Sequence, residues 1–250
     1  MCTLAVALQT DRRWPLVVAA NRDERLGRPA QDWDLRSGPS GVRFAAPLDL
    51  QAGGTWIGVA PTGLFAGVTN FHASPTPDPT RRSRGELVGL ALAHPSAAAA
   101  RQALGALEAS RYNPFHLLVA GGDGAFLWRW DGESAGFDAL GPGLHVVTES
   151  SAQGRCPRGE LVRARWPLDL TAEKLHQLLS IHGQAGQPDI CVHLDETYGT
   201  RSSVILRLAP SLAHSELFTT SAAPCTALPE DRSDLLQALA ASGPAPARST

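Results

Sequence analysis

A cysteine at position 2 and several polar motifs farther along the chain carry the side chains that could do chemistry. Removal of Met1 would leave Cys2 with a thiol and a free α-amine on the same residue. An α-amine titrates near ~7.7 to 8.0 and a cysteine thiol near ~8.5, so the amine can accept the thiol proton at neutral pH. Cys2 would then supply both nucleophile and base. Taken alone, a cysteine here is also typical of a small buried strand residue.

The polar motifs follow one another in a specific order. They are Asn21-Arg22-Asp23-Glu24, Gly53-Gly54-Thr55-Trp56, Ser83-Arg84-Gly85 and Gly199-Thr200-Arg201-Ser202-Ser203. With the Met-Cys start, they resemble the NRDE family, which includes the transport and Golgi organisation homologues, from Cys2 to about Leu208. That family is similar to choloylglycine hydrolases, penicillin V acylases and acid ceramidase, which are N-terminal-nucleophile (Ntn) hydrolases. The resemblance implies an α+β fold, a four-layer αββα sandwich of two antiparallel sheets covered by helices.

The resemblance also implies a role for each charge in the first polar run. It places Arg22 beside the Cys2 thiol, where a cation favours the thiolate, and it gives Asp23 or Glu24 the task of holding the α-amine. We predict that Arg22 and Asp23 are catalytic, although related amidases carry their aspartate three residues beyond the arginine. The alternative is that these charges are simply solvated at a strand end.

Three further positions complete the predicted site. By resemblance, Asn70 donates a hydrogen bond to a tetrahedral oxyanion, and the alternative is that it ends a strand because it tolerates turn geometry. Arg201 matches a late catalytic arginine of the same families, and its alternative is a surface strand charge. Trp56 could line an apolar substrate pocket, although tryptophan in a strand is more often part of the core.

Glu149 is a departure from the family pattern. Relatives usually show Ser-Asn where this chain has Thr148-Glu149, and the amidases carry a second oxyanion donor there. An ionised Glu149 cannot donate a hydrogen bond and would repel an oxyanion. This substitution argues against amidase catalysis, and it leaves the fold and Cys2 unaffected.

Hydrophobic patterning predicts the elements that position these residues. Strands are expected at 3–8, 16–20, 54–59, 64–70, 115–120, 125–130, 144–148, 203–208 and 216–220, and helices at 84–93, 96–107, 158–165 and 172–180. Ser83 and Glu86 could form a capping box at the first helix. Residues 25–51 are rich in Pro, Gly and charged side chains and are expected to form a long loop, with the polar run 21–24 at a strand end.

Length and composition fit one domain. The chain has 250 residues, 43% of them hydrophobic, and we expect a single domain over 1–242 followed by a disordered tail over 243–250. A net charge of −2 without a basic stripe argues against nucleic acid. The apolar run 4–8 is too short for a signal peptide, and no other run could span a membrane, so we expect a cytoplasmic protein.

The cysteines and histidines show no metal-binding spacing. Cys2, Cys156, Cys191 and Cys225 form no CxxC pair, and the eight histidines form no HExxH motif. We therefore predict no metal and no cofactor, and we assign no role to the last three cysteines. The sequence is compatible with a homo-oligomer.

Two functional hypotheses follow, with a structural protein as a weaker third. The first is a cysteine Ntn hydrolase that acts on a nonpeptide amide or related acyl compound through a thioester. The alternative is a non-catalytic carrier of a hydrophobic ligand, such as an acyl chain or haem, on the same fold. Glu149 favours the carrier, whereas Cys2, Arg22 and Arg201 favour the hydrolase.

Overall fold

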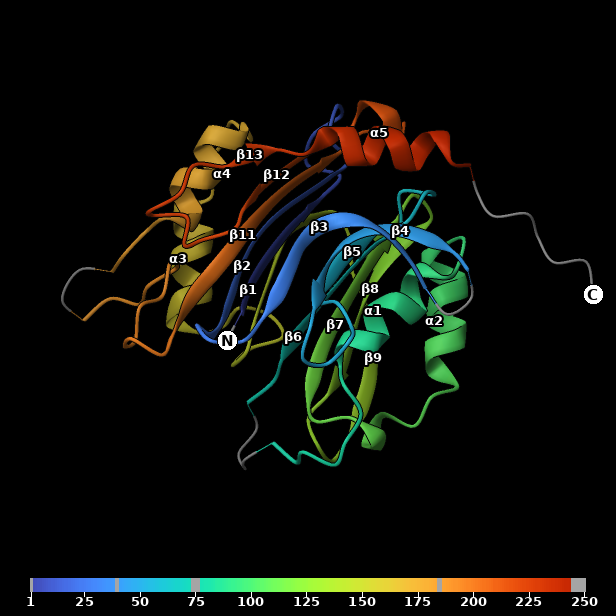
Figure 1. Cartoon of the computed structure of the whole chain (residues 1–250), viewed down its shortest axis with the longest axis horizontal. Coiled ribbons are helices and arrows are strands. Elements are labelled where there is room, and N and C mark those ends of the chain that lie inside the picture. Colours follow the sequence, from blue (N-terminus) through green and yellow to red (C-terminus); the bar gives the residue numbers. More distant parts are fainter. Residues whose placement is uncertain (1, 39–40, 73–76, 184–185, 244–250) are drawn as a thin grey trace, which may run out of the picture.

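The computed structural model describes residues 2–38, 41–72, 77–183 and 186–243. Two antiparallel β-sheets face each other, and helices cover the outer face of each sheet (Figure 1). This arrangement confirms the α+β, four-layer αββα sandwich. The predicted tail begins at Gly243, and its residues 244–250 lie outside the described residues. The single domain over 1–242 therefore stays a prediction, as does the disorder of the tail.

The described strands belong to two sheets. The first sheet has the order β10 (Gly143–Thr148), β1 (Cys2–Leu8), β2 (Leu16–Arg25), β11 (Tyr198–Leu208), β12 (Glu216–Thr220) and β13 (Glu230–Asp231). The second has the order β3 (Ala30–Ser37), β4 (Arg43–Asp49), β5 (Ile57–Val59), β6 (Phe65–Asn70), β7 (Phe115–Gly121), β8 (Gly124–Trp130) and β9 (Ala135–Ala139).

Helices cover both outer faces of the sandwich. The second sheet is covered by α1 (Gly85–Leu92) and α2 (Ala97–Gly105), and the first by α3 (Pro157–Arg165) and α4 (Ala172–Leu179). Short 3₁₀ turns, η1 (Ala109–Arg111) and η2 (Leu212–His214), precede β7 and β12. The four predicted helices are confirmed, with ends that differ by at most two residues.

The side chains of β1 alternate between the core between the sheets and the core under the helices. Leu4 and Val6 belong to the core between the sheets, whereas Ala5 and Ala7 belong to the cluster under α3 and α4. Successive side chains of a strand point to opposite faces. Because both faces of β1 are buried, its sequence is a continuous apolar run, and the small alanines allow the helices to lie close.

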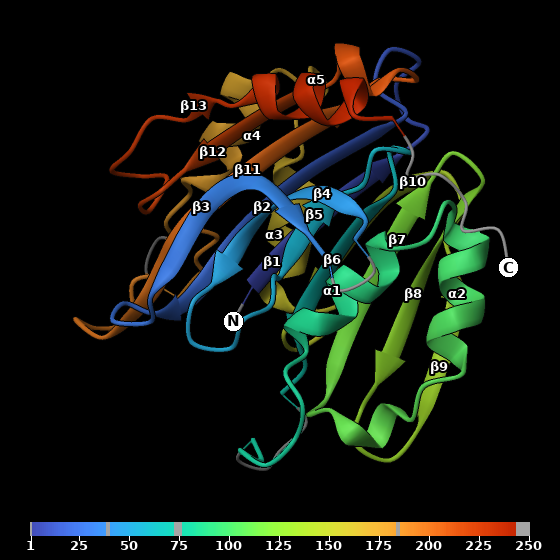
Figure 2. The same ribbon diagram turned by 45° about the vertical axis from the view of Figure 1, so that its right-hand side comes forward.

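A fifth helix, α5 (Ser233–Ala241), closes one edge of the core. It contacts β12 of the first sheet and β3 and β4 of the second, and Figure 2 shows it along the top of the molecule. Leu235, Leu236 and Leu239 belong to the core between the sheets. The sequence analysis predicted no helix here.

The prediction of a long loop over 25–51 was wrong. These residues contain the hairpin of β3 and β4, whose strands pair from Ala30 with Asp49 to Ser37 with Arg43. On β3 only Trp33 is buried, and its neighbours are polar and exposed or half-exposed. The apolar signal of β3 is therefore weak, with Leu35 only partly buried, and the buried run of β4 is interrupted by Pro47, which is disfavoured in strands.

Two local predictions also need correction. The run Asn21–Glu24 lies inside β2 rather than at its end, because the strand continues to Arg25 and pairs with both β1 and β11. The capping box at Ser83 does not form, because the Glu86 carboxylate pairs with Arg82 and accepts a hydrogen bond from Tyr112.

Two of the glycine motifs pack against each other. A β-carbon on Gly54 would lie 2.7 Å from the carbonyl carbon of Gly85, and a β-carbon on Gly85 would lie 3.1 Å from the backbone nitrogen of Thr55. That nitrogen donates a hydrogen bond to the Gly85 carbonyl oxygen at 3.2 Å. The Gly-Gly-Thr-Trp and Ser-Arg-Gly motifs therefore allow the loop before β5 to touch the start of α1.

We predict that Gly54→Ala lowers the free energy of unfolding by about 1–3 kcal/mol, because the new β-carbon meets backbone atoms that cannot move aside. Gly89→Ala is the matched control, since a β-carbon there meets nothing within 4 Å. In mid-helix this change should stabilise the protein by up to about 1 kcal/mol. Urea unfolding of both variants measures the effects, and equal stabilities would contradict the close approach.

Candidate active site

Strand pairing places Cys2 opposite Arg22. Cys2 is the first residue of β1 and pairs with Arg22 of β2, which in turn pairs with Ser202 of β11. Side chains directly opposite one another share a face of the sheet, with β-carbons about 4.5–5.5 Å apart. The thiol and the guanidinium are therefore neighbours, as the resemblance implied.

Arg201 lies on an irregularity of the neighbouring strand. The register of β11 with β2 shifts between Thr200 and Ser202, so Arg201 is the extra residue of a β-bulge. Its guanidinium donates hydrogen bonds to the carbonyl oxygens of Leu26 and Arg28. The bulge thus turns Arg201 toward the chain that follows β2 and toward the cavity beside Cys2.

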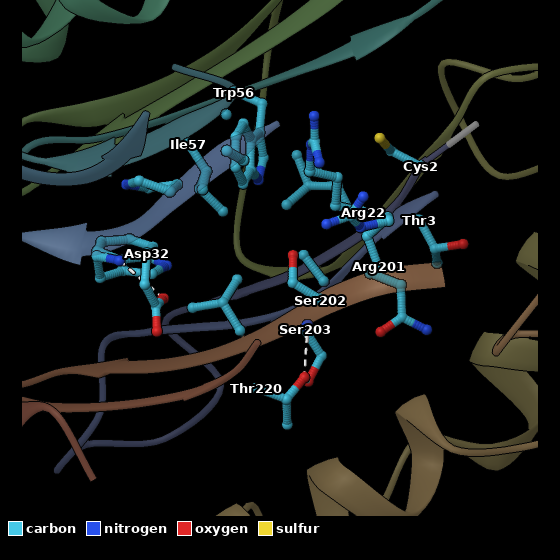
Figure 3. Close-up of a pocket in the computed structure, with 18 of the residues that line it drawn as sticks. Cys2, Thr3, Arg22, Asp32, Trp56, Ile57, Arg201, Ser202, Ser203 and Thr220 are labelled. Atoms are coloured by element: carbon cyan, nitrogen blue, oxygen red, sulfur yellow. Dashed lines mark hydrogen bonds between the residues drawn. The ribbon is translucent and has the colours of Figure 1, made fainter. Parts of the chain in front are cut away.

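A cavity of about 90 Å³ lies between the two sheets next to Cys2. Figure 3 shows Cys2, Arg22 and Arg201 on one side of it and Trp56 and Ile57 on the facing side. Apolar atoms form the larger part of the wall surface, and polar side chains, among them Gln31, Asp32 and Thr220, also line it. The apolar residues include Leu4, Ala20, Trp33, Trp56, Ile57, Val68 and Val204. The predicted residue Trp56 therefore lines this cavity.

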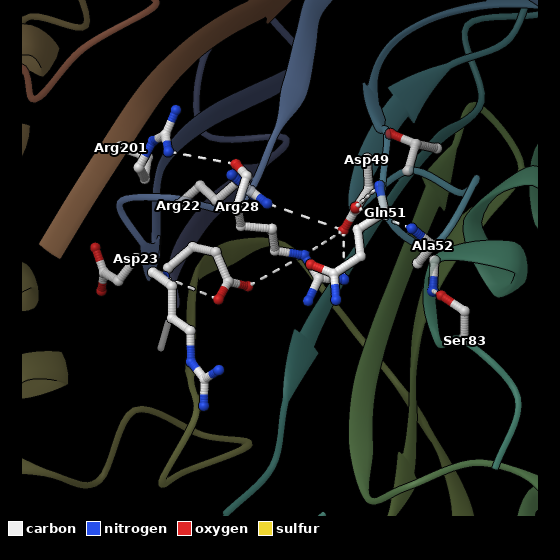
Figure 4. A network of polar contacts seen from close by, with 12 residues as sticks. Arg22, Asp23, Arg28, Asp49, Gln51, Ala52, Ser83 and Arg201 are labelled. Carbon is white, nitrogen blue, oxygen red and sulfur yellow. Dashed lines mark hydrogen bonds and ion pairs between the residues drawn. The ribbon is translucent and has the colours of Figure 1, made fainter. Parts of the chain in front are cut away.

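Arg22 is held in place by an aromatic ring and a carboxylate. Its guanidinium carbon lies 4.1 Å from the Trp56 ring centroid, and its Nη2 lies 3.9 Å from Asp49 Oδ2. The same Asp49 oxygen accepts 2.8 Å contacts from Arg28, and its other oxygen accepts the backbone N–H of Gln51 (Figure 4). With 6% of its side chain exposed, Arg22 has little freedom to leave the thiol.

Opposing effects act on the Cys2 thiol. Burial raises its pKa above the usual range, and the nearby charge of Asp23 acts in the same direction. A hydrogen bond from the backbone of Asp23 and the charge of Arg22 act the other way. The net direction is upward, so Cys2 needs a base close by to react at neutral pH.

Asp23 is a buried carboxyl group with its own partners. Thr200 Oγ1 donates to Asp23 Oδ1 at 2.6 Å, and Arg158 Nη1 lies 3.3 Å from Asp23 Oδ2. Tyr198 donates its hydroxyl proton to the Asp23 backbone carbonyl at 2.9 Å. Burial raises the pKa of Asp23 to about 7 in spite of the hydrogen bond from Thr200 and the charge of Arg158. Asp23 can therefore change its charge near neutral pH.

Glu149 contacts the same arginine. Arg158 Nη1 lies 3.3 Å from Glu149 Oε2, so one guanidinium bridges Asp23 and Glu149. Glu149 does not line the cavity, and its backbone carbonyl accepts the N–H of His72 at 2.8 Å. The structure thus differs from the expectation at this position, because the Glu149 charge is compensated by Arg158.

Asn70 lies just past the cavity wall. It is the last residue of β6 and is half-buried, and the wall formed by β6 ends at Thr69. Thr69 Oγ1, at the cavity wall formed by β6, is buried and has no hydrogen-bond partner among the described residues. Thr3 Oγ1 is also unpartnered there, but Thr3 alternates with Leu4 and lies with Ala5 on the face of β1 that the helices cover. Buried hydroxyls nearly always have a partner, so the Thr69 hydroxyl is available to a bound polar atom.

Asp49, Arg158, Thr69 and Thr200 were not predicted from the sequence as part of the site. Asp49 lies in the hairpin that was predicted to be a loop, and Arg158 follows Pro157 in the first turn of α3 outside any motif. Thr200 belongs to a recognised motif, and its contact with Asp23 could have been proposed from that motif. No sequence spacing links Arg158 to Asp23, since only the fold brings them together.

Comparison with known proteins identifies the family. The family model described as Transport and Golgi organisation 2 matches residues 1–166. The chain belongs to this family. It is 33% identical over 108 residues to the "Transport and Golgi organization 2 homolog" of Mus musculus and 34% identical over 108 residues to the Bos taurus homologue. Each match covers 42% of this chain and 38% of the relative, so the chain spans well under half the length of these relatives.

Solved structures share the fold of this family member. A Caenorhabditis elegans N-acylethanolamine-hydrolyzing acid amidase ortholog has a TM-score of 0.57 at 13% identity, over 84% of this chain and 93% of that chain. A mutant of conjugated bile acid hydrolase from Clostridium perfringens has a TM-score of 0.55 at 9% identity, over 88% of this chain and 89% of that chain. These likenesses confirm the Ntn-hydrolase-like fold, and at such identities they show the fold alone.

No helix in the described ranges is long and apolar enough to cross a membrane. The cytoplasmic location expected from the sequence stays a prediction.

The raised pKa of Asp23 predicts a pH dependence of stability. A carboxyl whose folded-state pKa is raised stabilises the fold below its unfolded pKa of ~3.9, and this contribution is lost as the pH rises toward about 7. Asp23→Asn removes the titration. Relative to this variant, the parent chain should lose up to about 1.4 kcal/mol of unfolding free energy per pH unit between about pH 4 and 7.

Urea unfolding across this pH range measures the effect. All variants carry a short N-terminal extension, so that the charge of a free α-amine does not change the titration of Asp23. Asp138→Asn is the control, since it removes a carboxylate that is 41% exposed and paired with Arg129. Parallel stability curves for the parent chain and Asp23→Asn would contradict the assignment.

Proposed function

We propose that this chain is an Ntn-type cysteine hydrolase that cleaves a nonpeptide amide or a related acyl compound, with Cys2 as its nucleophile after Met1 is removed. One observation carries the proposal. Cys2 lies opposite the immobilised Arg22 at the edge of a cavity with apolar walls. A thiol beside a fixed cation and an apolar cavity is suited to attack the carbonyl of an acyl chain.

The reaction needs one residue as both base and nucleophile. The α-amine of Cys2 takes the thiol proton, and the sulfur attacks the acyl carbon to form a tetrahedral intermediate. When the C–N bond breaks, the leaving amine takes that proton from the α-ammonium, and an acyl thioester remains. Water then attacks the thioester with the α-amine as base, which releases the carboxylic acid and restores the thiol.

Neighbouring residues have roles that follow from their contacts. Arg22 stabilises the thiolate through its charge. Asp23, with a pKa of about 7, ionises when an α-ammonium group forms beside it and so holds the amine in place. Thr200 orients this carboxyl through its 2.6 Å hydrogen bond and is a positioning residue.

Two kinds of donor are available for the oxyanion. Asn70 keeps the role that the resemblance implied, with its amide one residue past the cavity wall. The unpartnered hydroxyl of Thr69 lies at the cavity wall itself. A donor that meets the developing negative charge contributes roughly 10² to 10³ in rate.

The cavity walls favour an acyl chain as the bound group. Apolar side chains from both sheets surround the space, and Arg22 and Arg201 place positive charge at the Cys2 end. The cavity volume of about 90 Å³ accommodates a few methylene groups and is far smaller than a haem. This volume favours an acyl chain over haem.

A carrier of the same ligand is the second candidate. The observation in its favour is Glu149, which replaces an amide donor of the related amidases and is ion-paired with Arg158. A carrier would use the apolar walls and the two arginines for binding, without turnover.

Hydrolysis of N-acyl amides of increasing chain length separates the candidates. The parent chain should turn them over, with kcat/KM rising up to about fourfold for each methylene group that enters the cavity, at ~0.8 kcal/mol each. Cys2→Ala should lower kcat at least ~10³-fold, because the nucleophile is lost. Binding of acyl chains by both forms with turnover by neither would establish the carrier instead.

Glu149→Asn tests the effect of the unusual acidic residue in the same assay. Because Arg158 already compensates the Glu149 charge, we expect kcat/KM to change by less than about tenfold. A full oxyanion donor would contribute well above this. A gain of 10²-fold or more would show that Glu149 opposes the oxyanion directly.

A further inference from the structure

Away from the cavity, four side chains with metal-ligating atoms meet at one place. They are His182, Cys191, His193 and Cys225, and their ligand atoms all lie within 4.8 Å of one another. His193 Nε2 lies 3.6 Å from Cys191 Sγ and 3.2 Å from Cys225 Sγ. Cys191 is buried and the other three are exposed, so the cluster lies at the surface with one sulfur inside.

We propose that these four residues form a structural zinc site. Zn²⁺ prefers a tetrahedron of thiolate and imidazole ligands, at about 2.3 Å to sulfur and 2.0–2.1 Å to nitrogen. The edges of such a tetrahedron are about 3.3–3.8 Å long. The separation of 3.6 Å from His193 to Cys191 lies in this range, the 3.2 Å to Cys225 is slightly shorter, and separations of up to 4.8 Å elsewhere in the cluster would shorten on binding. Two thiols lose their protons on binding, and their two negative charges balance the ion.

The donor set argues for zinc over other metals. Two sulfurs and two ring nitrogens are typical of zinc, whereas calcium and magnesium take oxygen ligands. All four tetrahedral positions would be filled by protein atoms, so no position stays open for water or substrate. The site would therefore stabilise the fold rather than catalyse a reaction.

Backbone contacts bring the first two ligands together without using their side chains. The carbonyl oxygen of Ile181 accepts the N–H groups of Ile190 and Cys191, at 3.0 and 2.9 Å. This closes the chain so that His182 and Cys191 approach each other. The ligand geometry thus follows from a hydrogen-bonded turn.

Hydrogen bonds that do not involve the ligand side chains also hold the other two residues. Ser180 Oγ donates to the Pro224 carbonyl at 3.0 Å, which places Cys225 beside the end of α4. His193 forms an isolated bridge with Gly199, where a β-carbon would lie 2.8 Å from the Val192 carbonyl oxygen. The glycine of the Gly-Thr-Arg motif therefore allows the segment with His193 to lie close to β11.

The same segment contacts the candidate active site. Asn21 Nδ2 donates to the Ile190 carbonyl at 2.8 Å, and Thr200 Oγ1 accepts the Val192 N–H at 2.8 Å while it donates to Asp23. A zinc ion bound next to Ile190 and Val192 would fix the chain that orients Asn21 and Thr200. We infer that the bound metal restricts the motion of Asn21 and Thr200, and thereby of Asp23, from the side of the sheet opposite the cavity.

The zinc content of the untagged full-length chain, purified without chelators and measured by mass spectrometry of the metal, tests the proposal. We expect about one zinc ion per chain. Cys225→Ser and His193→Gln should each lower the bound zinc at least about tenfold. Cys156→Ser and His145→Gln are the matched controls and should keep it, because both residues lie outside the cluster.

A second measurement covers the case in which a ligand variant fails to fold. The parent chain is stripped with a chelator and then titrated with Zn²⁺ alone, and its melting temperature should rise until one equivalent is bound. Co²⁺ in place of zinc should give a thiolate-to-metal absorption band that Cys225→Ser weakens.

Three results would overturn the proposal. They are a freshly purified chain that neither contains zinc nor is stabilised by it, equal zinc in Cys225→Ser and Cys156→Ser, or a disulfide between Cys191 and Cys225 in the isolated protein. None of these readouts uses acyl-amide turnover or Cys2, so the zinc site and the proposed hydrolase can fail independently.

Discussion

The antiparallel register of β1 with β2 is the constraint on which the site depends, because it sets Cys2 against Arg22. A slip of one residue would turn every side chain of β1 to the opposite face. The core prevents such a slip, since Leu4 and Val6 fill the space between the sheets while Ala5 and Ala7 lie under the helices. The packing that stabilises the fold therefore also positions the thiol.

Around this strand pair, buried charges are arranged in two groups. Asp49 holds Arg22 and Arg28 on one side of the thiol, and Arg158 bridges Asp23 and Glu149 on the other. Buried ion pairs contribute little net stability, because desolvation offsets their attraction. Their position around Cys2, together with the pKa of Asp23 near 7, is what a reactive site requires.

Much of this organisation could be predicted from the sequence. Helical spacing predicted four of the five helices and apolar runs predicted most strands, while the ordered motifs identified the family and the neighbourhood of Cys2 and Arg22. The hairpin of β3 and β4 was missed because Trp33 is the only buried residue of β3. Arg158 was missed because only the packed fold brings it to Asp23. In the cluster around His193, three residues are close in sequence, but their spacing matches no metal motif and Cys225 joins them only in the fold.

The pH dependence of Cys2 alkylation, followed by intact mass and peptide mapping, tests the central claim most directly. The account predicts that the purified chain lacks Met1 and that Cys2 is alkylated at neutral pH. Arg22→Leu should move the midpoint upward, because a neighbouring cation that lowers the pKa of Cys2 is lost. Arg28→Leu is the control, since it removes another partner of Asp49 and should leave the midpoint unchanged. Retention of Met1 in most molecules, or identical profiles for the parent chain and Arg22→Leu, would contradict the account.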